Sequence, residues 1–222
     1  MNRATKPTDR TRVRQQPGRG SYDSEVIHSI LDAGIVAHVG LALDSQPFVI
    51  PMLYGRSGNT LYLHGSAVSR TLHELATSII ACVTVTLVDG FVLARSAFHH
   101  SMNYRSVVAF GAARNLQGAP RKVQALRTIS EHVLAGRWND VRGPTRAELE
   151  TTSVLEFSIE EASAKVRQGP PIDDEEDYGR AVWAGVLPLC LETKTPVPDP
   201  RLPADTAVPE YVSRLVAKSH RG

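Results

Sequence analysis

The sequence predicts a mainly β protein in which six or more antiparallel strands form a barrel with helices on its flanks. Segments in which apolar and polar residues alternate recur along residues 35–116, and such alternation is typical of half-buried strands. Turn signals separate these segments, among them Asp89-Gly90. Only one helix signal interrupts them, whereas a doubly wound parallel sheet needs a helix at nearly every connection. The pattern therefore favours an antiparallel barrel.

The first half of the chain begins with a helix and continues into three strands. Asp23 is expected to cap the helix and Gly34 to end it. Strands are predicted over residues 35–43, 48–54 and 60–64. Pro51 restricts the second of them to a sheet edge, because proline has no N–H to donate to a neighbouring strand.

A second hairpin and a long strand are expected next. Residues 83–87 and 91–97 flank Asp89-Gly90, so this pair is predicted to turn the chain back on itself. The long strand covers residues 104–116, in which Gly111 is expected to mark a bulge or a barrel corner.

The second half adds two helices and three more strands. A helix is predicted to begin at Pro120 and to end near Gly136, and Thr145 is predicted to begin a short helix with a capping box. The remaining strands are expected over residues 153–159, 164–168 and 183–192.

These elements divide the chain into three parts. Residues 1–20 are polar and basic and predict a solvated tail; a nucleic-acid-binding arm is the alternative, although no aromatic residue is interleaved there. Residues 21–192 form the barrel domain. Residues 193–222 are rich in proline and are expected to hold a short helix over residues 209–218.

Bulk properties exclude several classes of protein. A chain of 222 residues with 42% hydrophobic residues can bury a sizeable core. Its net charge of +2 gives no general reason to expect nucleic acid or an acidic membrane as a partner. Cys82 and Cys190 fit neither a disulfide framework nor a zinc site. With no apolar run of about 20 residues and no signal-peptide core, a cytoplasmic protein without a metal site is expected.

Residues 66–75 have the features of an anion site. Ser69 is a candidate N-cap, and Arg70 lies in the first turn of the helix that follows. Free backbone N–H groups, the positive end of the helix dipole and a guanidinium together favour a phosphate. The alternative is an ordinary cap followed by a solvated arginine.

Five segments carry a family signature: FVIPMLYG, LYLHGSAVSR, AFHHSMNYRSVVAFG, EEASAKVRQGPP and YGRAVWAGVLPL. Together they resemble the FMN-binding split-barrel superfamily, specifically the pyridoxamine 5'-phosphate oxidase-related flavin-nucleotide-binding proteins that include the nitroimidazole-resistance type. The resemblance implies an FMN-binding split β-barrel that forms a homodimer with the flavin at the subunit interface. It also implies a flavin-dependent reductase or oxidase that acts on a small molecule.

The resemblance implies particular cofactor contacts as well. Ser69 and Arg70 would hold the flavin phosphate, and the edge strand would pair with the isoalloxazine ring. His64 would be a polar contact near the flavin, and Trp183 would lie against the ring. The implied set is Val49, Ile50, Pro51, Met52, Tyr54, His64, Ser69, Arg70, Tyr104, Arg105, Ser106 and Trp183, of which the Tyr104 strand would reach the partner's flavin. Taken alone, these residues also fit ordinary strands, a helix cap and a core aromatic.

Two departures bear on the activity. Pyridoxamine 5'-phosphate oxidases proper carry basic residues at the positions of Val49 and Tyr54, and a basic C-terminal segment in place of the proline-rich one. We therefore expect an unidentified small-molecule substrate rather than pyridoxamine 5'-phosphate, and no catalytic residue stands out. A non-catalytic carrier of FMN or haem is the alternative, and a deazaflavin is a further candidate cofactor. A single histidine of the pair His99-His100 could ligate haem or orient a substrate, although the two cannot easily chelate one metal together.

Overall fold

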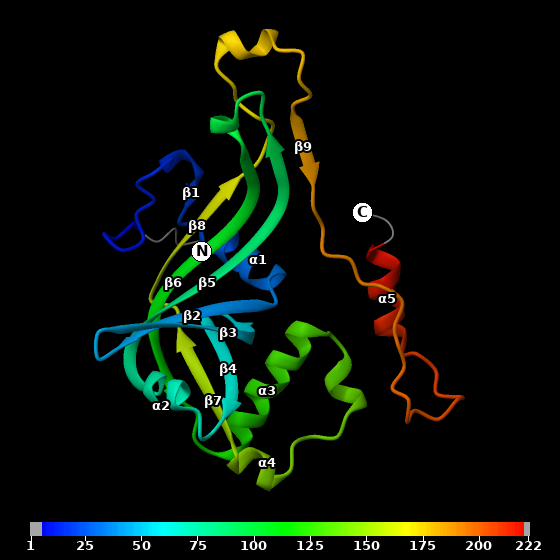
Figure 1. Ribbon diagram of the computed structural model, residues 1–222. Helices are drawn as coiled ribbons and strands as arrows, with labels where there is room; N and C mark the ends of the chain where they lie inside the picture. The colour runs from blue at the N-terminus through cyan, green and yellow to red at the C-terminus, as the bar shows by residue number, and fades with distance from the viewer. Residues whose placement is uncertain (1–5, 220–222) are drawn as a thin grey trace.

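The computed structural model describes residues 6–219 (Figure 1). Within that range, nine strands form one sheet: β1 (Gly20–Ser21), β2 (Val36–Leu43), β3 (Gln46–Ser57), β4 (Thr60–Ser66), β5 (Thr77–Leu93), β6 (Ser101–Asn115), β7 (Thr152–Ser158), β8 (Glu161–Arg167) and β9 (Gly185–Pro188). The helices are α1 (Ser24–Ala33), α2 (Arg70–Leu75), α3 (Ala119–Val133), α4 (Arg146–Glu150) and α5 (Glu210–Ser219). Short 3-10 turns are η1 (Pro17–Arg19), η2 (Ala97–His99), η3 (Arg137–Asp140) and η4 (Glu175–Gly179).

Six of the strands close into a barrel. The sheet order includes β6-β7-β4-β3-β2-β5, and β5 pairs back with β6, so these six strands form a ring. β8 and β1 extend the sheet beyond β6, and β9 extends it beyond β5. Inward-facing apolar side chains fill the barrel, among them Val39, Leu63, Val83 and Phe157. The predicted antiparallel barrel with flanking helices is confirmed.

β3 changes its partner part of the way along its length. Residues 46–53 pair with β2, whereas residues 54–57 pair with β4. In the part of the chain that the structure describes, no strand pairs with the other edge of residues 46–53. This portion of β3 is therefore an open edge, as Pro51 predicts.

The predicted hairpin at Asp89-Gly90 is wrong. β5 passes through this pair without turning, and it pairs with β6 both before and after Asp89-Gly90. The register slips by one residue between Val88 and Gly90, so Asp89 is the extra residue of a bulge. Its carboxylate accepts hydrogen bonds of 2.9 and 2.7 Å from Arg105. The long ladder with β6 thus overrides the local turn preference of Asp-Gly.

Gly111 lies where β6 exchanges one neighbour for another. β6 pairs with β8 up to Phe110 and with β7 from Ala113 onward. A Cβ atom at Gly111 would lie 1.8 Å from the carbonyl oxygen of Ser158. Glycine is therefore required at this corner of the barrel, which confirms the prediction.

Three predicted helix caps are present. Asp23 caps α1 and Ser69 caps α2, each accepting a hydrogen bond from a backbone N–H through its side chain. Thr145 and Glu148 form the capping box that begins α4. These helix starts were predictable because each cap involves residues only two or three positions apart.

α3 crosses the outer face of the barrel wall formed by β3, β4 and β7. The approach is close because Gly55 of β3 has no side chain: a Cβ atom there would lie 2.6 Å from the backbone N and Cα of Ile129. Ala125 and Ile129 are buried at this contact, whereas Leu126 is only half-buried and Val133 is exposed. The apolar stripe of α3 therefore extends beyond the surface that packs on the barrel.

Residues 6–20 do not form the solvated tail that their composition predicts. Thr11 is 4% exposed, and the side chains of Thr8 and Arg10 both bond the carboxylate of Glu161 in β8. β1 then pairs with β8. The tail packs because β8, distant in sequence, supplies its partners. Residues 1–5 lie outside the described residues.

The C-terminal extension passes alongside the barrel and ends in α5, close to the predicted helix (Figure 1). The Tyr211 side chain of α5 lies beside Gly136, and its hydroxyl accepts a hydrogen bond of 3.1 Å from Arg137. This contact joins the extension to the turn that follows α3.

Candidate functional site

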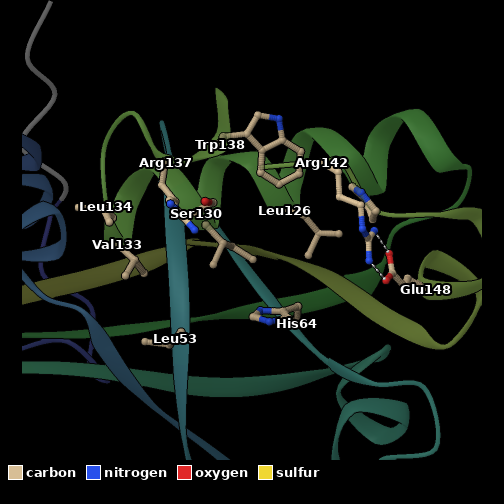
Figure 2. Close-up of a pocket in the computed structure, with 12 residues that line it drawn as sticks. Leu53, His64, Leu126, Ser130, Val133, Leu134, Arg137, Trp138, Arg142 and Glu148 are labelled. Carbon is tan, nitrogen blue, oxygen red and sulfur yellow. Dashed lines mark hydrogen bonds and ion pairs between the residues drawn. The ribbon is translucent and has the colours of Figure 1, made fainter. Parts of the chain in front are cut away.

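A cavity of about 650 Å³ lies between the barrel wall and α3, and we call it the His64 cavity. Figure 2 shows Leu53 of β3 and His64 of β4 on one side of it, and Leu126 and Trp138 on the opposite side. Ile129 and Val133 of α3, with Leu134 just after it, add apolar wall, whereas Arg137, Arg142 and Glu148 add charged groups. Its volume falls within the range of about 300–1,000 Å³ that is typical of small-molecule sites.

His64 is the chemically distinctive residue of this cavity. Its Nδ1 atom is buried and has no hydrogen-bond partner among the described residues. Burial lowers the pKa of the imidazole, so the ring is neutral near pH 7. Because Nδ1 is inaccessible, the nitrogen that a neutral His64 can offer to a metal centre or a polar ligand group is Nε2.

Two arginines line the cavity on the side of α3. Arg142 makes hydrogen bonds of 2.6 and 2.8 Å to Glu148, and these hold the pKa of that carboxyl at about 2. The hydrogen bond from Arg137 to Tyr211 raises the pKa of the Arg137 guanidinium. Both cations lie beside apolar walls, an arrangement that suits an apolar ligand with acidic groups (Figure 2).

The open edge of β3 adjoins the His64 cavity. Val49 is 64% exposed, and Pro51 and Leu53 are exposed on the same face of the strand. The backbone of residues 46–53 can pair with a ligand on the side away from β2, as the sequence predicts for Ile50 and Met52. Leu53 belongs both to this edge and to the cavity.

Tyr54 does not lie at the open edge. Its side chain is completely buried, its hydroxyl donates a hydrogen bond to the carbonyl oxygen of Leu31, and its backbone is paired with β4. Burial raises the pKa of its phenol. The predicted side-chain contact to a flavin is therefore wrong for Tyr54, because the strand has already moved to its second partner at this position.

Ser69 and Arg70 lie at the start of α2, as predicted. The Ser69 hydroxyl oxygen accepts a hydrogen bond of 3.4 Å from the N–H of Leu72. Arg70 is exposed and has no ion-pair partner among the described residues, so its guanidinium is available to an anion.

The other predicted contacts lie away from the His64 cavity. Tyr104, Arg105 and Ser106 are half-exposed on β6, where Arg105 pairs with Asp89 at 2.7 Å. Trp183 precedes β9 and is 69% exposed. None of these described residues lines the His64 cavity.

Sequence reasoning missed the side of the cavity that α3 and the following turn provide. In the sequence, Leu126 and Val133 belong to an apolar stripe of the kind that faces a core, and Arg137, Trp138 and Arg142 belong to no recognised motif. The available signal was an apolar stripe followed closely by a tryptophan and two arginines. Nothing in it showed that these side chains would face His64.

Neither a metal cluster nor a membrane span is evident in the described part of the chain. Residues 6–219 contain no group of three or more His, Cys, Asp or Glu side chains placed to hold one metal ion. None of the helices in that range is long and apolar enough to cross a bilayer.

The closed ring of six strands, with β3 shared between two neighbours, defines a split β-barrel. The chain belongs to the pyridoxamine 5'-phosphate oxidase family, whose sequence model matches residues 23–166. This confirms the family that the sequence motifs predict.

Solved structures give a more detailed comparison. The flavocytochrome Anf3 from Azotobacter vinelandii is 40% identical, with a TM-score of 0.87 over 94% of this chain and 97% of that one. An FAD and haem binding protein from Mycobacterium smegmatis is 35% identical, with a TM-score of 0.85 over 89% of this chain and 97% of that one. A putative 5-nitroimidazole antibiotic resistance protein from Bacteroides thetaiotaomicron is 25% identical, with a TM-score of 0.55 over 65% and 84%. No curated protein matches the sequence of this chain.

Proposed function

We propose that this chain is a redox protein that binds a flavin and a haem in neighbouring sites. The observation that carries the proposal is the His64 cavity, in which a neutral imidazole faces apolar walls. The flavocytochrome and the FAD and haem binding protein support it, because each resembles this chain over most of its length.

The residues of the His64 cavity fit a haem. A porphyrin is a flat apolar ring with two carboxylates, and the cavity offers aliphatic walls, Trp138 and two arginines. His64 would bind the haem iron, Arg137 would face a haem carboxylate, and Arg142 would do so beside Glu148, with which it is paired. The sequence has no Cys-x-x-Cys-His motif, so the haem would be held without a covalent bond. When bound, haem supplies one-electron and oxygen chemistry.

The flavin is assigned to the open edge of β3. Backbone groups of residues 46–53 would pair with its ring, and Arg70 would meet its phosphate. Leu53 lies at both the edge and the cavity, so the two cofactors would be close enough to exchange electrons. We propose FAD in place of the FMN that the motifs suggest, because the Mycobacterium relative is named for FAD.

A homodimer is part of the proposal. Phe91, Met102 and Leu187 are paired across β6, β5 and β9, and they are 43–53% exposed. This row of apolar side chains, with Trp183 near one end of β9, would be covered by a second copy. Diluting the protein should then dissociate the dimer and release flavin, as sedimentation and fluorescence would show; a monomer with tightly bound flavin would contradict this part.

The test of the cofactors is the absorbance spectrum of purified protein after addition of haem and FAD. The wild-type protein should show a Soret band together with flavin bands. His64→Ala should abolish the Soret band and retain the flavin, whereas His100→Ala, a matched change at an exposed histidine, should retain both. A Soret band that survives in His64→Ala but disappears in His100→Ala would move the haem to the other histidine that the sequence suggests.

An enzyme and a cofactor carrier differ in what the reduced flavin does. We propose an oxidoreductase, because the apolar edge formed by Val49 and Leu53 suits flat, weakly charged acceptors such as quinones or nitroaromatics. The bound flavin is to be reduced anaerobically, mixed with each acceptor and followed by its absorbance. Rapid reoxidation supports the enzyme. Transfer of intact cofactor to an apoprotein, with no reoxidation by any acceptor, supports the carrier.

A further inference from the structure

The N-terminal segment covers a second cavity, which lies over β6 and β8 and away from β3. Residues 10–15 lie over β6 and β8 and enclose a cavity of about 250 Å³, which we call the basic hollow. Its cationic lining residues are Arg10, Arg12, Arg14 and Lys165. Ser106 and Ser163 add hydroxyl groups, and no carboxylate is among the described residues that line it.

Most of this positive charge is unpaired. Arg10 is bound to Glu161, and its guanidinium lies 5.3 Å from the ring centroid of Phe110. Arg12, Arg14 and Lys165 have no ion-pair partner among the described residues. Three cations around one small hollow repel each other unless an anion lies between them.

A buried arginine next to the hollow strengthens the argument. Arg167 follows Lys165 by two residues on β8, so both side chains extend from the same face of the sheet. Arg167 is 7% exposed, and the groups that accept its hydrogen bonds are neutral: the Asn103 side chain and the carbonyl oxygens of Gly169 and Pro170. Its Nε has no partner among the described residues. A buried charge without a counter-ion is costly. Arg167 does not itself line the hollow, but its charge adds to the positive potential that an anion in the hollow would offset.

We infer that the basic hollow binds the diphosphate group of a nucleotide. Guanidinium forks, the Lys165 ammonium and the Ser163 hydroxyl are donors that match phosphate oxygens, and three free cations would offset the negative charge of a diphosphate. The Ser106 hydroxyl already donates to the carbonyl oxygen of Lys165. The hollow is too small to accommodate a nucleic-acid strand, which would need a longer groove along the backbone.

Two sources could supply this diphosphate, and they predict different numbers of ADP molecules bound per chain of flavin-loaded protein. In the sheet, β2 and β5 separate β3 from β6, over which the basic hollow lies. The first source is FAD, which in this case would extend from the β3 edge of one copy to the hollow of a second, so that Arg70 of the first copy and the hollow would contact the two ends of one diphosphate. The second source is a free nucleotide. Only the FAD source depends on the proposed flavin function.

The experiment is calorimetric titration of the purified protein with inorganic pyrophosphate, then with ADP and with adenosine. Pyrophosphate and ADP should bind, and adenosine should not. Lys165→Gln and the double variant Arg12→Gln/Arg14→Gln should each raise the pyrophosphate Kd about ten- to a hundredfold, the loss expected for charge-assisted hydrogen bonds. Arg127→Gln, which removes one exposed charge from α3, should leave the Kd unchanged.

Further measurements separate the possible outcomes. Variants that lose FAD affinity but keep riboflavin affinity would assign the diphosphate to the cofactor. ADP that binds flavin-loaded protein at one per chain would assign it to a free nucleotide. No pyrophosphate binding, or binding that the variants leave unchanged, would overturn the inference. The inference would also be overturned if single-stranded DNA bound more tightly than pyrophosphate and the same variants abolished the DNA binding. Unchanged melting temperatures would show that the variants remain folded.

Discussion

The close packing of α3 on the barrel can be tested at Gly55. A Cβ atom at this position would lie 2.6 Å from the backbone N and Cα of Ile129 and 2.7 Å from the carbonyl carbon of Thr128. Carbon atoms in contact normally lie about 3.5 Å apart, so Gly55→Ala should force α3 away from the barrel by about 0.9 Å. The backbone φ of Gly55 is not positive, so alanine meets a steric obstacle and no conformational one.

The free energy of unfolding that Gly55→Ala is expected to lose lies near the upper end of the range for overpacked cores. Such substitutions typically cost about 1–3 kcal/mol, and here the obstacle is a helix backbone that cannot rotate aside. We therefore expect a loss of about 3 kcal/mol and a fall in melting temperature of about 6–12 °C for a domain of this size. Because α3 carries Leu126 and Ile129 into the wall of the His64 cavity, haem retention should fall as well.

The assay is urea and thermal unfolding of Gly55→Ala beside Gly143→Ala, followed by haem titration of both. Gly143 has no atom within 4 Å of an added Cβ and no positive φ, so its variant should be as stable as the wild type. If Gly55→Ala were as stable as Gly143→Ala and bound haem equally well, the close contact between β3 and α3 would be wrong.

Three further predictions concern individual side chains. Tyr54→Phe should lower the free energy of unfolding by about 1–3 kcal/mol, because it leaves the buried carbonyl of Leu31 unsatisfied. The flavin affinity of the folded variant should not change. Weaker flavin binding by a variant with full stability in urea would return Tyr54 to the cofactor site. Arg70→Ala should weaken binding of the flavin nucleotide relative to riboflavin by about one to two decades in titrations, since only the nucleotide has phosphate; equal losses would remove Arg70 from the site. Burial lowers the pKa of His64 in the folded chain, so the unfolded chain binds more protons, and the free energy of unfolding of the apoprotein should fall as the pH drops below about 6.5. Urea midpoints against pH should be flatter for His64→Gln, and parallel curves would contradict the burial of this imidazole.

Local signals in the sequence were sufficient for the helix starts and most strands. Asp23, Ser69 and the capping box at Thr145 each depend on residues two or three positions away, so the sequence contains the whole interaction. The edge character of β3 was predictable for a similar reason, because a missing N–H at Pro51 is a property of the residue itself.

Where distant segments compete with local preference, the sequence was misleading. Asp89-Gly90 has the composition of a hairpin turn, yet the ladder with β6 and the ion pair with Arg105 keep β5 extended through it. Residues 6–20 have the composition of a tail, yet Glu161 and the edge of β8 hold them against the sheet.

The family, the antiparallel barrel and the start of α2 at Ser69 and Arg70 could all be predicted from the sequence. The burial of Tyr54 in the core and the position of α3 over His64 became evident from the folded chain alone. The physical reason is that a cavity is defined by two surfaces. His64 lies on β4 and Trp138 lies in the turn after α3, and no local pattern shows that Gly55 brings them together.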